Sequence, residues 1–145
     1  MDLRVPLLPW WVRWTVVAGL AAFIFYVSIV TVPPETVVDQ VKPSDAFQRD
    51  KWRHFVAYAA LGYALAYATT DWDLDGRTLA AVVLLTTVVY GVGIEFGQSL
   101  LPSRYFSVAD GVANALGGTL VLPWYLLRSR VEFVPVSRFA ASLTQ

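Results

Sequence analysis

The sequence predicts an all-α membrane protein, a single domain in which four transmembrane helices form a bundle. Three observations lead to this fold class. Hydrophobic residues make up 57% of the 145-residue chain and charged residues only 15%, whereas a soluble domain is about half apolar and about a quarter charged. Four apolar stretches each approach the ~20 residues that a helix needs to cross a bilayer. The six tryptophans lie near the ends of these stretches, where aromatic rings favour the headgroup layer.

The first helix is expected over residues 14–32, which carry no charge. Pro33 and Pro34 end it, because proline lacks a backbone donor and clashes with the preceding turn. The stretch is longer than the apolar region of a secretory signal peptide, and no small-residue cleavage motif follows it. We therefore expect this helix to be retained.

The other three helices are expected over residues 52–70, 78–101 and 108–127. Short links between them make neighbouring helices antiparallel, so a four-helix bundle places both termini on one side of the membrane. That side carries six basic residues near the helix ends and the opposite side carries five. By the positive-inside rule, this small excess predicts cytoplasmic termini.

Composition and motifs exclude several classes of function. The net charge is zero, and no basic stripe is interleaved with aromatic residues, so no nucleic-acid partner is expected. The absence of cysteine excludes disulfides, thiolate nucleophiles and cysteine-bound metals. A single histidine excludes two-histidine lipid phosphatases, and neither a Gly-x-Ser-x-Gly elbow nor a His-Glu-x-x-His zinc motif occurs.

Polar residues follow one face at the start of the second helix. Asp50, His54 and Tyr58 are spaced at i, i+4 and i+8, and Lys51 lies one turn before His54. Asp50 could orient the imidazole of His54 and raise its pKa towards neutrality. The alternative is that Asp50 and Lys51 are solvated charges at a helix end and that His54 is an interfacial histidine with satisfied hydrogen bonds.

The third helix carries Glu95 about 9 Å before its end, where an unpaired carboxylate is costly. Gln98 follows one turn later on the same face, and Gly93 and Gly97 permit close approach of another helix. A charged group inside a membrane segment predicts function. The alternative is a protonated or hydrogen-bonded Glu95 that fixes helix packing.

The fourth helix begins with a second polar pair, Asp110 and Asn114. Ser107 and Asp110 fit a capping box, which would explain Asp110 structurally, but the amide of Asn114 needs a partner within the bundle. Arg104, in the preceding loop, can pair with a carboxylate or an anionic headgroup. The topology brings all these residues to one leaflet, opposite the termini, and the other helix ends carry little comparable polarity.

Three segments of this chain, residues 50–58, 93–98 and 104–117, resemble the VanZ-like family of small membrane proteins. The namesake of this family is associated with teicoplanin resistance, so the resemblance implies the cell envelope and its lipid-linked precursors, and glycopeptide resistance as a family association. It does not imply a reaction. The residues whose importance it supports are Asp50, Lys51, His54, Tyr58, Glu95, Gln98, Arg104, Asp110 and Asn114.

The sequence leaves three functions open for a multi-pass protein of the cell membrane. The first is an enzyme that acts on an anionic lipid or lipid-linked envelope precursor by acid–base chemistry. The second is a non-catalytic lipid or ligand binder, and the third is a structural partner of another membrane protein. For catalysis we single out His54, Glu95, Asp50 and Asp110. For ligand binding we single out Lys51, Tyr58, Gln98, Arg104 and Asn114.

No cofactor is expected from the sequence. His54, Glu95 and Asp110 could offer one nitrogen and several oxygens to a metal ion. Nothing in their spacing fixes a coordination geometry, however, so the sequence alone gives no reason to expect a metal.

Overall fold

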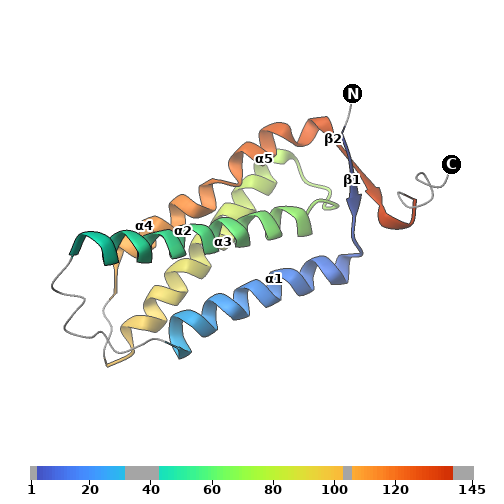
Figure 1. The fold of residues 1–145 in the computed structure, drawn as a ribbon. Helices are drawn as coiled ribbons and strands as arrows, with labels where there is room; N and C mark the ends of the chain where they lie inside the picture. Colours follow the sequence, from blue (N-terminus) through green and yellow to red (C-terminus); the bar gives the residue numbers. More distant parts are fainter. Residues whose placement is uncertain (1–2, 32–42, 103–105, 139–145) are drawn as a thin grey trace.

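The computed structural model describes residues 3–31, 43–102 and 106–138, with backbone only for residues 43–50. The protein is largely helical, as the sequence predicts (Figure 1). Its elements are β1 (Leu3–Leu7), α1 (Trp10–Phe25), the π-helix η1 (Tyr26–Val30), α2 (Pro43–Ala68), α3 (Gly76–Ser99), α4 (Val108–Thr119), α5 (Leu122–Leu127), the 3₁₀ turn η3 (Arg128–Arg130) and β2 (Val131–Pro135).

Two of the described helices are long and apolar enough to cross a membrane. One is the continuous stretch of α1 and η1, 21 residues from Trp10 to Val30, and the other is α3, with 24 residues. The expected spans at residues 52–70 and 108–127 correspond to α2, which starts with charged residues, and to the two short helices α4 and α5. Length and composition thus support two of the four expected spans.

The expected continuous helix over residues 108–127 is instead broken between Thr119 and Leu122. The last turn of α4 tightens, because the amides of Leu120 and Val121 bond carbonyls only three residues back, at 3.1 and 3.3 Å. Pro123, in the first turn of α5, has no amide with which to continue the α4 ladder. An uninterrupted fourth helix was therefore a wrong prediction.

Helix α2 contacts α1, α3 and α4, and it begins nine residues before the expected position. Its residues Leu61 and Leu65 join Val17 of α1 and Val83 of α3 in the buried core. The contact with α4 requires Gly117, since a Cβ there would lie 3.0 and 3.1 Å from the backbone C and Cα of Phe55. Small residues in this way bring two helix backbones together and fix the middle of α2 against α4.

A two-stranded parallel sheet joins the first and last described segments of the chain. Strand β1 pairs with β2 in a register that sets Leu3 opposite Val131. The Tyr67 hydroxyl links this sheet to α2, because it accepts a bond from the Leu8 amide (3.0 Å) and donates one to the Pro6 carbonyl (2.8 Å). The sequence analysis predicted no strand in either segment.

The same end of the bundle holds a buried arginine. Arg13 is only 3% exposed, and its guanidinium donates to the Ala68 carbonyl (2.9 Å) and to Asp71 Oδ2 (2.6 Å). Arg128 donates to the Thr70 carbonyl (2.6 Å). Two arginines therefore cap the C-terminal end of α2. The expectation that helix ends on this side carry little polarity was wrong, since Arg13 is a buried structural residue.

Candidate functional site

The start of α2, the end of α3 and the start of α4 lie at the end of the bundle opposite the β1–β2 sheet (Figure 1). This end carries His54 on α2, Glu95 on α3, and Asp110 and Asn114 on α4. Glu95 and Asn114 are almost fully buried. The sequence prediction that these side chains converge is confirmed geometrically, and we call them, with Lys51, the polar cluster.

Three side chains of the polar cluster form a chain of interactions. His54 Nδ1 lies 2.9 Å from Asn114 Oδ1, and Asn114 Nδ2 donates to Glu95 Oε1 at 3.5 Å. His54 Nδ1 is itself 3.9 Å from Glu95 Oε1. Because the amide oxygen of Asn114 can only accept, Nδ1 carries the proton in this arrangement, and in a neutral imidazole the lone pair then lies on Nε2. The arrangement holds His54 as an oriented base or ligand.

Asp110 has a structural and a local electrostatic role. Its backbone amide donates to the Ser107 hydroxyl at 3.2 Å, which confirms the Ser107 half of the expected capping box at the start of α4. The Asp110 carboxylate instead pairs with Lys51 of α2. Asp110 thus connects α4 to α2 at the edge of the polar cluster.

Gly91 creates the space in which the polar cluster packs. A Cβ at this position would lie 3.0 Å from the Tyr58 ring and 3.1 Å from Asn114 Cβ. Tyr58 is therefore packed beside Asn114, and it is 1% exposed. Sequence reasoning singled out Tyr58 but missed Gly91, whose only signal is a small residue one turn before Glu95.

Two buried polar atoms at this end have no hydrogen-bond partner within the described part of the chain. They are Glu95 Oε2 and the hydroxyl of Tyr58. Native proteins satisfy most buried polar atoms, so such orphans call for an explanation. Arg104 and the side chain of Asp50, both predicted site residues, lie outside the described residues.

A cavity of about 750 Å³ opens beside the polar cluster. Residues of α1 and η1, including Leu20, Ile24 and Val27, form an apolar wall, and His54, Tyr58 and Gln98 contribute polar groups. Gln98 also donates to the Ser28 carbonyl of η1 at 3.1 Å. The structure therefore places Gln98 at the cavity wall, bonded to η1. Sequence reasoning missed the contribution of η1, whose residues carry no charge.

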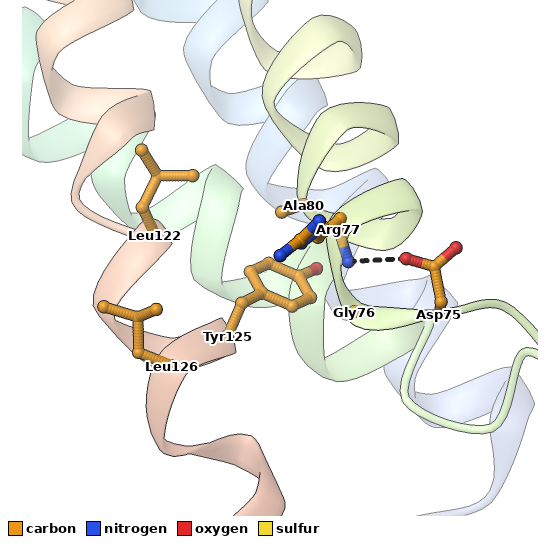
Figure 2. A pocket seen from close by; sticks show the side chains of 7 residues that line it. All are labelled: Asp75, Gly76, Arg77, Ala80, Leu122, Tyr125 and Leu126. Carbon is orange, nitrogen blue, oxygen red and sulfur yellow. Dashed lines mark hydrogen bonds between the residues drawn. The ribbon is translucent and has the colours of Figure 1, made fainter.

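A second cavity, of about 720 Å³, lies at the opposite end of the bundle. Figure 2 shows Arg77 next to the Tyr125 ring, with Leu122 and Leu126 on the facing helix. Asp75 turns back to cap α3, accepting from the amides of Arg77 (2.9 Å) and Thr78 (3.1 Å). The hydrogen bond from the Thr78 side chain lowers the pKa of Asp75. Its carboxylate is thus explained by helix capping, and the cavity beside the polar cluster is the stronger candidate.

Comparison with known proteins identifies the class of this helical protein. The sequence profile of the VanZ/LLP1 family matches residues 7–128, which include every predicted site residue. The chain belongs to this family. Together with the two apolar helices, this membership indicates a membrane protein.

The chain is also similar to an uncharacterized protein of the yeast Schizosaccharomyces pombe, with 33% identity over 93 residues. This alignment covers 62% of the present chain and 56% of the yeast protein, so the chain spans about half the length of that relative. No solved structure matches.

Proposed function

We propose that this protein crosses the cell membrane several times and binds an anionic lipid or a lipid-linked envelope precursor. The headgroup would lie at the polar cluster and an acyl or prenyl chain in the adjoining cavity. One observation carries the proposal: the cavity joins an apolar wall on α1 and η1 to the side chains of His54, Tyr58 and Gln98. Ligand pockets of this size combine apolar walls with a few convergent polar groups.

The outer surface beside the cavity suits a hydrocarbon chain. Phe23 and Val27, which line it, are 62% and 42% exposed on one of the two stretches that are long and apolar enough to cross a membrane. In a bilayer these side chains would contact lipid. A lipid could therefore enter from the membrane, with its chain against α1 and its headgroup at the start of α2.

Basic and aromatic groups support an anionic headgroup at the mouth of the cavity. Arg53 and Trp52 line the cavity at the start of α2, and both are exposed. Arginine binds phosphate and carboxylate in a two-pronged geometry, and tryptophan favours the headgroup layer. Sequence reasoning did not assign Arg53. Lys51 and Arg104 are further headgroup ligands in this proposal.

The membrane arrangement is part of the same proposal. Four spans, formed by the two apolar stretches, by α2 and by the α4–α5 pair, would leave both termini in the cytoplasm. The polar cluster would then face the extracytoplasmic leaflet. Cysteine-accessibility labelling at residue 2 and at a position within residues 32–42 tests this: labelling of both positions from the same side would contradict it.

Native mass spectrometry of the detergent-purified protein tests lipid binding directly. We expect a retained anionic lipid, and we expect Arg53→Ala and Lys51→Ala to reduce its occupancy. Arg77→Ala is the matched control, because it removes an arginine at the opposite end of the bundle. Equal loss of lipid from Arg77→Ala and Arg53→Ala would contradict a site at the polar cluster.

Acid–base processing of the bound lipid is a second candidate, favoured by the interaction of Glu95, Asn114 and His54. His54 Nε2 would accept a proton from a hydroxyl group of the ligand or of water, and Glu95 would stabilise the imidazolium. Glu95→Gln keeps the shape and removes the negative charge. It should abolish turnover of the retained lipid and spare its binding. If Glu95→Gln, Lys51→Ala and Arg104→Ala change only thermal stability, the polar cluster is a structural network instead.

A further inference from the structure

We propose that His54, Glu95 and Asp110 form a binding site for a divalent transition-metal ion. The sequence indicates the same three residues as possible ligands, but it fixes no coordination geometry, because they come from three different helices. In the folded chain each residue offers one ligand atom, and these three atoms all lie within 4.8 Å of one another. A shift of well under 1 Å per side chain brings such a set to the distances of a coordination sphere.

The burial of Glu95 is a second, independent indication of a ligand. Its side chain is 0% exposed, and Oε2 has no hydrogen-bond partner among the residues described. Oε1 already faces Asn114 and His54. A carboxylate oxygen without a partner in this environment is costly, and a metal ion at the polar cluster would satisfy it.

The surroundings of His54 match those of metal-binding histidines. Such a histidine usually donates its second ring N–H to a carbonyl or carboxylate, which fixes the ring orientation. Here Nδ1 is bonded to Asn114 Oδ1, and Asn114 is held in turn by Glu95. While that bond is kept, Nε2 is the nitrogen that remains for a metal ion; Nδ1, 3.9 Å from Glu95 Oε1, would be the ligand if Asn114 released it.

Charge explains how such an ion would serve the proposed lipid site, and this link rests on the proposed function. Among the described groups of the polar cluster, the charge of Lys51 is opposed by the two carboxylates of Glu95 and Asp110. Beyond Arg53 at the mouth of the cavity, an anionic headgroup would therefore meet a cluster that is net negative or neutral. A divalent ion on the two carboxylates would reverse this sign and could bind a phosphate oxygen itself.

The ligand set indicates the class of ion. Two carboxylates and one imidazole suit ions such as Mn²⁺, which accept oxygen and nitrogen ligands together. Asp110 bonds Lys51 through Oδ1 and keeps a second oxygen for a metal. Three protein ligands leave further positions open for water or a headgroup.

Metal binding can be measured without any lipid. EDTA-treated protein in detergent is titrated with Mn²⁺ and free Mn²⁺ is followed by electron paramagnetic resonance. We expect one bound ion per chain. Glu95→Gln and Asp110→Asn should each weaken binding by more than about tenfold, and Asp71→Asn, at the other end of the bundle, should bind as the wild type does. Equal affinity in all four proteins would overturn the proposal.

Thermal unfolding of the same samples separates a lost ligand from a lost fold. Mn²⁺ should raise the Tm of the wild type and of Asp71→Asn, because an ion that binds only the native state stabilises it. It should leave the Tm of a folded Glu95→Gln protein unchanged. An equal rise in Glu95→Gln would overturn the assignment of Glu95 as a ligand.

Binding to vesicles of zwitterionic lipid, with and without added anionic phospholipid, distinguishes this inference from the proposed function. The purified protein is reconstituted into these vesicles and treated with EDTA or with Mn²⁺, and the lipid that stays bound to the protein is then analysed. Enrichment of anionic lipid that occurs only with Mn²⁺ supports both the proposed lipid site and the metal site. Enrichment that EDTA leaves unchanged keeps the proposed lipid site and overturns its link to the metal. Mn²⁺ binding without any lipid enrichment keeps the metal site and overturns the lipid site.

Discussion

The two ends of the helical bundle differ in how completely their buried charged side chains are bonded. At the end near the β1–β2 sheet, Arg13 is buried, but it bonds two backbone carbonyls and the carboxylate of Asp71. At the other end, Glu95 is equally buried, yet one of its oxygens has no partner in the described parts of the chain. Arg13 Nε also lacks a partner among the described residues, but the other guanidinium nitrogens bond the end of α2 and Asp71 at 2.6–3.2 Å. The hydrogen bond from Asn114 to Glu95, by contrast, is long, at 3.5 Å.

This difference indicates what each end is for. Charges that cap helix termini stabilise a fold, and their removal lowers stability. Incompletely satisfied charges beside a cavity lower stability and persist where function requires them. Substitutions at the Arg13 end should therefore reduce stability, whereas substitutions at the Glu95 end should reduce ligand binding.

The largest effect is expected from Arg13→Met. It leaves the carbonyls of Tyr67 and Ala68 and the carboxylate of Asp71 without their donor, so the free energy of unfolding should fall by about 2–4 kcal/mol. Chemical unfolding in detergent measures this loss. Arg130→Met is the control, since Arg130 is exposed and should change stability by less than about 0.5 kcal/mol. Similar values for both variants would remove the contrast between the two ends.

Gly117→Ala should have the next largest effect. Its Cβ would collide with the backbone of Phe55 and force α4 away from α2, at a loss of about 1–3 kcal/mol. Gly111→Ala in the same helix meets nothing within 4 Å, so it should be neutral or stabilising by up to about 1 kcal/mol. Thermal unfolding of the two variants tests how strictly the glycine at 117 sets the helix separation.

Glu95→Gln should change stability little and Mn²⁺ binding strongly. The amide keeps the shape of the side chain and removes a buried charge, so the free energy of unfolding should stay within about 1 kcal/mol of the wild type or rise. Lipid retention and Mn²⁺ affinity are the accompanying measurements. A loss of stability comparable with that of Arg13→Met would mean that Glu95 is as structural as Arg13.

Asp71→Asn should have the smallest effect, and this effect should depend on pH. The hydrogen bond from Arg13 lowers the pKa of Asp71 below its ordinary value of 3.8. Its contribution is therefore present above that value and is lost as the pH falls through the lower, native pKa. The carboxylate is nearly half exposed, so the contribution should not exceed about 1 kcal/mol.

The test is the difference in Tm between the wild type and Asp71→Asn, followed from about pH 6 to about pH 2.5. This difference in Tm should be largest at the highest pH of the series and shrink towards zero at the lowest pH. A difference that grows as the pH falls would contradict this pairing.

Local periodicity predicted much of the fold and of the site, but not what depends on distant contacts. Apolar runs located the helices within a few residues at most ends, and helical spacing placed His54, Glu95 and Asn114 where they meet. The pairing of β1 with β2 and the capping role of Arg13 depend on partners far away in the sequence. The break at Thr119 has a local cause, Pro123 and the tightened turn before it, which the continuous apolar run concealed. Arg13 in particular looks like an ordinary flanking charge until the end of α2 is seen beside it.

The β1–β2 pairing has a consequence for the order in which the chain assembles. Arg4 and Glu132, which form an ion pair across the two strands at 2.9 Å, are 128 residues apart. During synthesis β1 is made long before β2. We therefore expect the helices to associate first and β1 to pair with β2 last. A fusion or deletion that disturbs either strand should then leave the helices native and the two strands unpaired. Faster hydrogen exchange of the Val5 and Phe133 amides would detect the loss of pairing.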